Sequence, residues 1–195
     1  MLIGLDFDNT IVRYDAVFES LAKGRGLPCD VAAAGKTAIR DFLRAAGRED
    51  EWTIMQGEAY GSQMQSAEQF EGVGPFIQAA AACGHRLVIV SHRTRVPYLG
   101  LSTDLHASAR EWLSKRDFRD LVDDFFLEET AAEKATRIRI LGCEVFVDDL
   151  WEFLERPDFP PGVRRIWFDG SMSGASRTGL ERAAGWPAVE ALVLG

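Results

Sequence analysis

The stretch Leu2-Ile3-Gly4-Leu5-Asp6-Phe7-Asp8-Asn9-Thr10 decides how the chain is expected to fold. Its first four residues form a continuously apolar run, which is typical of a parallel strand buried on both faces. Two aspartates at alternate positions and a threonine follow at once. We therefore predict a strand over Leu2–Leu5 that ends in a polar segment, where open α/β sheets bind their ligands.

Similar apolar runs recur along the chain and predict further buried strands. They cover Leu87–Val90, Val145–Val147, Ile166–Phe168 and, more weakly, Asp124–Leu127. Helical patterns lie between and after them, over Phe76–Cys83, Asp104–Lys115, Thr130–Leu141 and Pro187–Leu194. Strands that alternate with helices of this length predict an α/β fold with a doubly wound, mostly parallel sheet.

The segment from Arg13 to Gln69 interrupts this alternation. It carries helical patterns over Val17–Leu21, Ala38–Ala46 and Glu51–Tyr60 but no clear strand. We predict that residues 13–69 form a small helical insert after the first strand, while residues 1–12 and 70–195 form the α/β core.

Polar side chains follow three of the predicted strands. They are Asp6, Asp8, Ser91, His92, Asp148 and Asp149. Because the carboxyl ends of parallel strands share one edge of the sheet, we expect four carboxylates and a hydroxyl to meet there. Two carboxylates about 4 Å apart repel each other by roughly 4 kcal/mol at an effective dielectric constant near 20, so the group needs a cation or a bound proton. Oxygen ligands of this kind suit Mg²⁺, which also bridges to phosphate.

These residues, in this order, resemble the four motifs of the haloacid dehalogenase (HAD) superfamily. The resemblance rests on Asp6-Phe7-Asp8-Asn9-Thr10, Ser91, Lys134 and Asp148-Asp149, and it covers about Met1–Arg13 and Gly72–Asp169. The insert at Arg13–Gln69 stands where that superfamily places its small helical cap. The resemblance implies a Rossmann-like catalytic core with such a cap.

The resemblance also implies catalytic roles. Asp6 would attack phosphorus and form an aspartyl-phosphate. Asp8 would protonate the leaving oxygen and then deprotonate water. Ser91 and Lys134 would hold the phosphoryl oxygens as charge redistributes. Superfamily members that cleave carbon–halogen bonds typically lack the second aspartate, so Asp8 favours phosphoryl chemistry.

The implied metal site uses the same end of the sheet. Mg²⁺ would be held by Asp6, Asp149 and the backbone carbonyl of Asp8, with Asp148 as a supporting or water-mediated ligand. The fourth motif departs from the superfamily pattern, which often has a further acid four or five residues beyond Asp149. This chain has Phe153 and Leu154 there.

Three residues are candidates for binding the substrate, namely Thr10, His92 and Arg93. The segment of residues 92–98 is longer and more basic than a tight turn between a strand and a helix needs. We expect this segment to reach over the site and contact the substrate.

The composition of the chain indicates which binding partners and which cellular compartment to expect. The chain of 195 residues has 22 Lys and Arg against 30 Asp and Glu, a net charge of −8, which argues against binding to nucleic acid polymers or anionic membranes. We expect no membrane-spanning segment and no signal peptide. The three cysteines contain no CxxC pair, so we expect no disulfide framework and a cytoplasmic location.

The sequence therefore predicts a Mg²⁺-dependent phosphohydrolase that acts on a small phosphorylated metabolite, for which a sugar phosphate and a nucleoside monophosphate both fit. Two alternatives use the same residues. One is a phosphotransferase to a hydroxyl acceptor, and the other is a module that binds metal and phosphate without turnover. The intact Asp6, Asp8, Ser91 and Lys134 argue against the silent module.

Overall fold

In a computed structural model of the chain, residues 1–170 and 177–195 are described, and they form two compact units. The first unit comprises Met1–Val12, Gln69–Arg93 and Arg116–Gly195, and the second comprises Arg13–Glu68 and Thr94–Lys115. The second unit thus includes a segment that lies within the range 70–195 of the expected core. The assignment of catalysis to one unit and of a covering role to the other stays a prediction.

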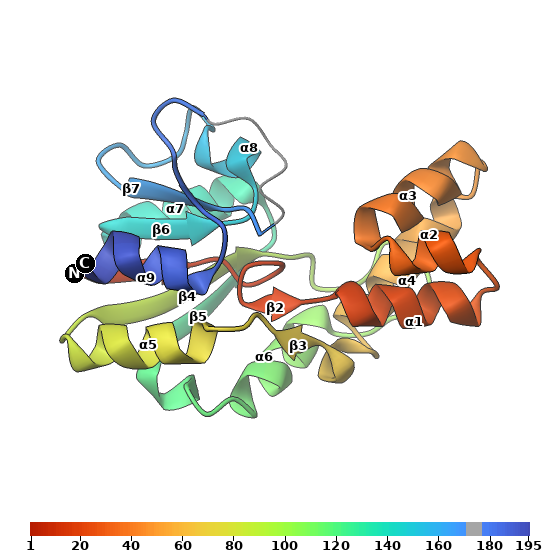
Figure 1. Cartoon of the computed structure of the whole chain (residues 1–195), viewed down its shortest axis with the longest axis horizontal. Coiled ribbons are helices and arrows are strands. Elements are labelled where there is room, and N and C mark those ends of the chain that lie inside the picture. The colour runs from red at the N-terminus through yellow and green to blue at the C-terminus, as the bar shows by residue number, and fades with distance from the viewer. Residues whose placement is uncertain (171–176) are drawn as a thin grey trace. The chain divides into compact units, whose positions relative to one another are not determined.

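The first unit is built around a six-stranded sheet with the order β5-β4-β1-β6-β7-β8 (Figure 1). The strands are β1 (Leu2–Leu5), β4 (Arg86–His92), β5 (Asp124–Glu128), β6 (Val145–Asp148), β7 (Arg164–Phe168) and β8 (Glu181–Ala183). All five predicted strands are present and all neighbouring pairs run parallel, so the predicted α/β fold class is confirmed. Of the six strands in this sheet, β8 alone was not predicted, because it is short and two of its three residues are charged.

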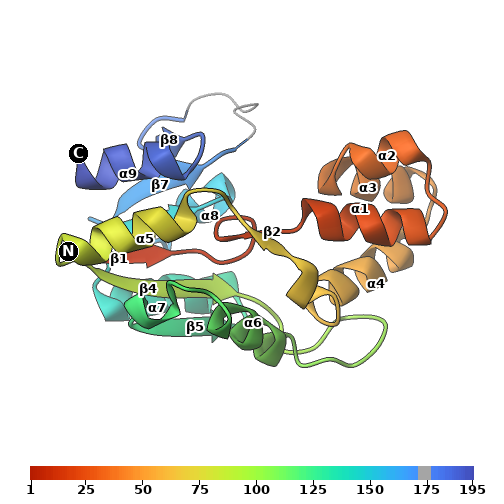
Figure 2. The ribbon, with the colours of Figure 1, turned by 60° about the horizontal axis from the view of Figure 1, so that its bottom comes forward.

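Helices cover both faces of this sheet (Figures 1 and 2). They are α5 (Val73–Ala82), α7 (Ala131–Leu141), α8 (Trp151–Leu154) and α9 (Trp186–Leu194), with a 3₁₀ turn η2 (Arg119–Leu121). On one face, α5 and α9 contact each other through Phe76 and Trp186, whose ring centroids lie 5.0 Å apart. On the other face, Ile138 of α7 and Phe153 of α8 pack in one apolar cluster with Val88 of β4. The sheet is therefore buried between two layers of helices, as its continuously apolar strands require.

The start of α7 follows the sequence closely. Thr130 accepts a hydrogen bond from the Glu133 backbone at 3.1 Å, and the Glu133 carboxylate accepts one from the Thr130 backbone at 3.0 Å. This is the predicted capping box. It fixes the first residue of α7 and therefore the side of the helix on which Lys134, the residue after Glu133, lies.

The second unit is mainly helical. It contains α1 (Asp15–Gly24), α2 (Cys29–Ala33), α3 (Lys36–Ala45), α4 (Glu49–Tyr60), the 3₁₀ turn η1 (Met64–Ser66) and α6 (Leu105–Ser114). Phe18 stacks on Trp52 with ring centroids 5.3 Å apart. The indole of Trp112 in α6 donates a hydrogen bond to the Ala67 carbonyl at 2.8 Å. Segments 13–68 and 94–115 thus share one core.

Close backbone packing also ties the segment after β4 to the second unit. A Cβ atom at Gly57 in α4 would lie 2.8 Å from the Cβ atom of Pro97. Two short strands, β2 (Val12–Arg13) and β3 (Glu68–Gln69), pair with each other where the chain leaves and re-enters the first unit. The sequence analysis expected no strand there, because two residues are too few to form a pattern.

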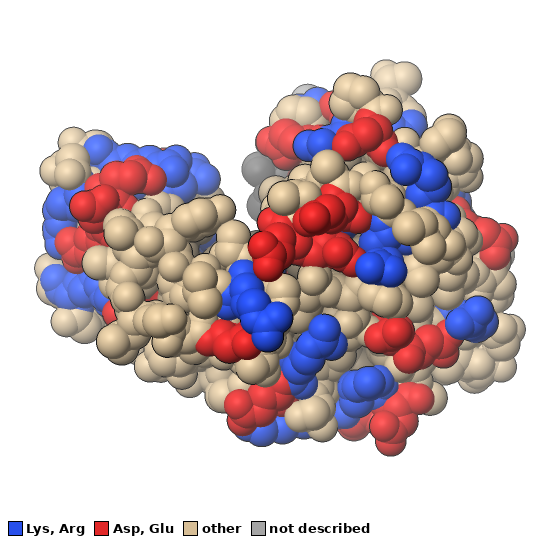
Figure 3. Space-filling model, turned by 180° about the vertical axis from the view of Figure 1, so that it is seen from behind, with Lys and Arg blue, Asp and Glu red and all other residues tan. Residues whose placement is uncertain are grey.

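The surface and the cysteines complete the description. Among the described residues, no helix combines the length and the apolar character needed to cross a membrane. Lys and Arg are interspersed with Asp and Glu on the face shown in Figure 3. All three cysteines are free thiols, with Cys29 and Cys83 exposed and Cys143 buried. The cytoplasmic location stays a prediction.

Candidate active site

Side-chain alternation in β1 and β6 brings two acidic residues to the same face of the sheet. A Cβ atom at Gly4 would lie 2.5 Å from the ring of Phe146, so these two residues face each other on the side that α7 covers. Successive side chains of a strand point to opposite faces. Asp6, two residues after Gly4, and Asp148, two residues after Phe146, therefore share that side, and Lys134 of α7 reaches both.

Lys134 is almost completely buried and forms two ion pairs. Its Nζ lies 2.5 Å from Oδ1 of Asp6 and 2.7 Å from Oδ2 of Asp148, and its side chain is only 1% exposed. Burial lowers the pKa of Lys134, but the attraction of Asp148 and Asp6 outweighs it and raises the pKa above its usual value. The ammonium also lies 4.4 Å from the ring centroid of Phe153. Phe153, which stands where the HAD superfamily often has a further acid, thus packs its ring against Lys134.

Asp148 is fully buried at the end of β6. Burial raises the pKa of its carboxyl to about 7, because the opposing effect of Lys134 is smaller and the nearby Asp6 adds to the rise. One oxygen accepts from Lys134, and the other accepts from the backbone N–H of Leu150 at 2.9 Å. The carboxylate is therefore fixed in orientation from two sides.

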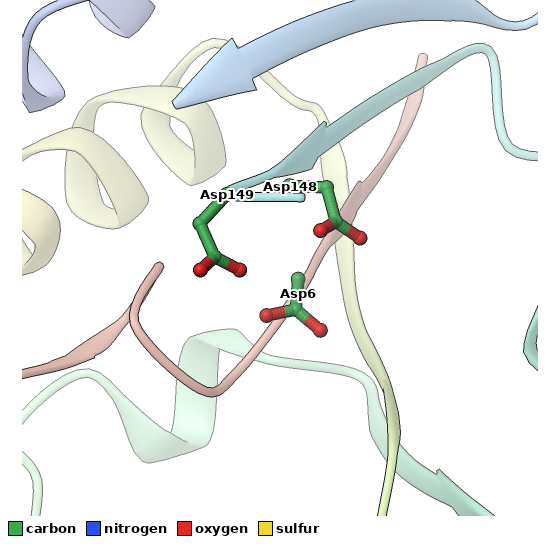
Figure 4. Close-up of side chains that lie close together, drawn as sticks. All are labelled: Asp6, Asp148 and Asp149. Atoms are coloured by element: carbon green, nitrogen blue, oxygen red, sulfur yellow. The ribbon is translucent and has the colours of Figure 1, made fainter. Parts of the chain in front are cut away.

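Three carboxylates converge at the ends of β1 and β6 (Figure 4). Oxygens of Asp6, Asp148 and Asp149 all lie within 4.8 Å of one another. The structure thus brings together three residues that the sequence analysis named as metal ligands. The backbone carbonyl of Asp8 as a further ligand stays a prediction. Such a set of carboxylate oxygens is what Mg²⁺ prefers in proteins.

The buried hydroxyl of Thr10 joins the two strand ends. It donates to Oδ2 of Asp6 at 3.2 Å and accepts from the backbone N–H of Asp149 at 3.1 Å. The indole of Trp186 in turn donates to the Thr10 carbonyl at 3.1 Å. The turn between Asp6 and Thr10 is tight, and Asn9 adopts a left-handed φ of 59° that asparagine tolerates better than most residues. A contact between Thr10 and the substrate stays a prediction.

Arg93 pairs with Asp8, a contact that the sequence analysis did not foresee. Its guanidinium donates to both carboxylate oxygens of Asp8, through Nε at 3.1 Å and through a second, closer nitrogen. The Arg93 side chain is 3% exposed and that of Asp8 is 19% exposed. The backbone N–H of Arg93 is held by the Glu128 carbonyl at 2.7 Å, and its guanidinium lies over the Phe7 ring. A forked arginine–carboxylate pair of this kind fixes the direction of both groups.

Ser91 and His92 lie inside β4, which continues two residues further than predicted. Ser91 is buried and His92 is half-buried. Burial and the charge of Lys134 lower the pKa of His92, against the opposing effects of Asp6 and Asp8. The His92 ring therefore lies within electrostatic reach of Lys134, Asp6 and Asp8. Contacts of Ser91, His92 and Arg93 with a substrate stay predictions.

No family model and no curated protein sequence matches the chain, but solved structures do. An L-2-haloacid dehalogenase superposes with a TM-score of 0.62 at 14% identity, over 100% of this chain and 98% of the other. A HAD phosphatase from Thermococcus onnurineus gives 0.55 at 15% identity, over 98% and 97%. CbbY from Rhodobacter sphaeroides, in complex with phosphate, gives 0.54 at 16% identity, over 95% and 94%.

The chain thus has the fold of HAD-superfamily hydrolases, as the sequence motifs implied. At such low identities the similarity establishes the fold alone. Because a dehalogenase and a phosphatase share this fold, the reaction has to be inferred from the site itself.

Proposed function

We propose that this chain is a Mg²⁺-dependent phosphohydrolase that acts on a small phosphomonoester through an aspartyl-phosphate on Asp6. The observation that carries the proposal is the convergence of Asp6, Asp148 and Asp149, whose oxygens lie within 4.8 Å of one another. Lys134 bridges two of them. The proposed nucleophile, the proposed metal ligands and a buried ammonium therefore lie at one end of the sheet.

Asp6 is suited to be the nucleophile because its carboxylate is held in place before the substrate arrives. Lys134 binds one oxygen and Thr10 the other. Attack of an Asp6 oxygen on phosphorus forms the new P–O bond as the ester P–O bond breaks. Water then attacks the same phosphorus, inorganic phosphate leaves, and the Asp6 carboxylate is regenerated.

Asp8 is the candidate proton carrier. In the first step it gives a proton to the departing ester oxygen, and in the second it takes one from the attacking water. In the structure both Asp8 oxygens accept hydrogen bonds from Arg93, so one oxygen has to leave this pair before Asp8 carries the proton. The two aspartates of the first motif then have separate tasks, which supports phosphoryl transfer over cleavage of a carbon–halogen bond.

The residues present fit a magnesium ion. Asp6 and Asp149 would hold it, with Asp148 directly or through water, because these three supply converging carboxylate oxygens. When bound, the ion would supply positive charge against the phosphoryl oxygens and lower the repulsion between phosphate and carboxylates. Ser91 and Lys134 would hold the remaining phosphoryl oxygens.

A small phosphorylated metabolite is the proposed substrate. Support comes from the net charge of −8, which disfavours polyanions as partners, and from the phosphate bound by the structurally similar CbbY. A sugar phosphate and a nucleoside monophosphate both meet this description.

The test is release of inorganic phosphate from a panel of phosphomonoesters, with Mg²⁺ and again with excess chelator. We expect phosphate release in the presence of Mg²⁺ and none in excess chelator. In Asp6→Asn, kcat should fall by about 10³-fold or more. Asp41→Asn makes the same chemical change at an exposed site in α3 and should keep full activity. An Asp6→Asn variant as active as wild type would overturn the proposal.

The same assay separates hydrolysis from transfer. With p-nitrophenyl phosphate and an added alcohol, a hydrolase releases equal amounts of p-nitrophenol and phosphate. An excess of p-nitrophenol over phosphate would instead identify a phosphotransferase. No release from any ester, together with measurable Mg²⁺ and phosphate binding, would identify the silent module.

A further inference from the structure

The backbone of Asp149, a proposed metal ligand, is held at both of its hydrogen-bonding groups. Its N–H donates to the Thr10 hydroxyl at 3.1 Å, and its carbonyl accepts from the indole Nε1 of Trp167 at 3.1 Å. Trp167 lies in β7 directly opposite Asp148 in the register of the β6–β7 pair and is 6% exposed. The backbone of Asp149 is therefore held partly by a ring in the neighbouring strand.

The Trp167 ring is itself held in place from the next strand. The guanidinium of Arg182, which pairs with Trp167 in the β7–β8 register, lies 4.8 Å from the ring centroid. Both its Nε, at 3.1 Å, and a second nitrogen donate to one oxygen of Asp169, at the end of β7. A guanidinium stacked on an indole and paired with a carboxylate restricts the rotation of that indole. The contacts run in series from Asp169 through Arg182 and Trp167 to Asp149.

We propose that Trp167 is a positioning residue for the metal site, and that Arg182 and Asp169 act through it. The inference rests on the proposed function, because it takes Asp149 as a metal ligand. Its physical basis is general. Groups that orient metal ligands without touching the metal typically alter metal affinity by about 10- to 100-fold when they are removed. Trp167 holds a backbone carbonyl, so we expect an effect at the lower end of that range.

The first test is calorimetric titration of the full chain with Mg²⁺, comparing wild type with Trp167→Phe. Phenylalanine keeps an aromatic ring beneath Arg182 and removes the N–H donor. Trp112→Phe is the matched control, because its indole also donates to a backbone carbonyl, that of Ala67, at 2.8 Å but in the second unit. We expect the Mg²⁺ dissociation constant to rise about tenfold in Trp167→Phe and to stay unchanged in Trp112→Phe.

The melting temperature in chelator separates positioning from general destabilisation, since both variants lose one buried hydrogen bond. A Trp167→Phe protein that folds and binds Mg²⁺ as tightly as wild type would overturn the inference and leave the proposed function intact. Wild-type protein that binds no Mg²⁺ would instead overturn the proposed metal site, and this inference with it.

A second variant decides the matter if Trp167→Phe does not fold. Arg182→Gln leaves the indole donor in place and removes the guanidinium that holds the ring. We expect it to weaken Mg²⁺ binding by about threefold, the loss of one cation–π contact. Unchanged affinity in that variant would count against the inference. In wild-type protein, the indole N–H resonance of Trp167 should shift on addition of Mg²⁺, while that of Trp112 should not.

Discussion

Replacing Lys134 by methionine tests how much its two buried ion pairs contribute to the stability of the folded chain. Methionine is also unbranched, but it lacks the ammonium, which lies 2.5 Å from the Asp6 carboxylate and 2.7 Å from that of Asp148. At an effective dielectric constant near 20, each of these contacts corresponds to about 6 kcal/mol of Coulomb attraction. Much of that attraction offsets the desolvation of the buried charges. Removing one partner of a buried ion pair typically destabilises a protein by about 3–5 kcal/mol, which is the loss that we expect at pH 7.5 without metal.

The pH dependence of this loss has a definite sign. Burial already raises the pKa of Asp148 to about 7, against a usual value of 3.8, and Lys134 opposes that rise. Without Lys134 the pKa of Asp148 rises further. Below about pH 7 both folded proteins hold this proton; above it the wild-type Asp148 releases the proton while the variant keeps it, so only the variant goes on losing stability as the pH rises. The deficit of Lys134→Met should therefore be largest at pH 7.5 and shrink toward pH 5.

Urea denaturation followed by circular dichroism, in chelator at pH 7.5 and pH 5, measures both effects. Lys115→Met is the control, because Lys115 is an exposed lysine paired with Glu111 at 2.7 Å. Exposed ion pairs contribute little, and we expect this variant to match wild type at both pH values. A Lys134→Met protein as stable as wild type at pH 7.5, or a deficit that grows as the pH falls, would refute the reasoning.

Other predictions address packing, thiol chemistry and the forked ion pair. Gly4→Ala places a methyl group 2.5 Å from the Phe146 ring and should lower the free energy of unfolding by about 1–3 kcal/mol. Gly24→Ala is the control, because a Cβ atom there has nothing within 4 Å and should not lower it. Urea denaturation of both variants measures the difference. Burial raises the pKa of the Cys143 thiol to about 11, so Ellman's reagent at pH 8 should modify two thiols in the folded protein and the third only after unfolding. Three fast thiols would contradict that account. Arg93→Lys cannot form the forked pair, and kcat for phosphate release should fall about tenfold, the loss of one charge-assisted hydrogen bond; unchanged kcat would show that the pair is dispensable.

Much of the fold could be predicted because its signals are local. The buried strands are continuously apolar, and each parallel strand keeps that pattern whatever its neighbours are. Thr130 and Glu133 specify the start of α7 by themselves, because the capping box needs only those two side chains. By contrast, Glu181–Ala183 forms an edge strand only because β7 lies beside it.

Some residues of the candidate site could likewise be predicted from local patterns, whereas the contacts between distant residues could not. Asp6 and Asp149 could be named from the sequence because they follow strands whose ends must meet at one edge. The pairing of Arg93 with Asp8 and the hydrogen bond from Trp167 to Asp149 join residues far apart in the chain, and no local pattern announces them. The inclusion of residues 94–115 in the second unit likewise depends on packing against α4.

The central claim, a covalent phosphoryl intermediate on Asp6, can be tested most directly with an Asp8→Asn variant and p-nitrophenyl phosphate in Mg²⁺. The good leaving group needs no proton, so the intermediate forms, while loss of the base slows its hydrolysis. Borohydride treatment after acid quenching reduces an aspartyl-phosphate to homoserine, and trypsin cleavage after Arg13 releases the peptide of residues 1–13 for mass spectrometry. We predict homoserine at position 6. An unreduced Asp6 in protein that has released p-nitrophenol would contradict the account.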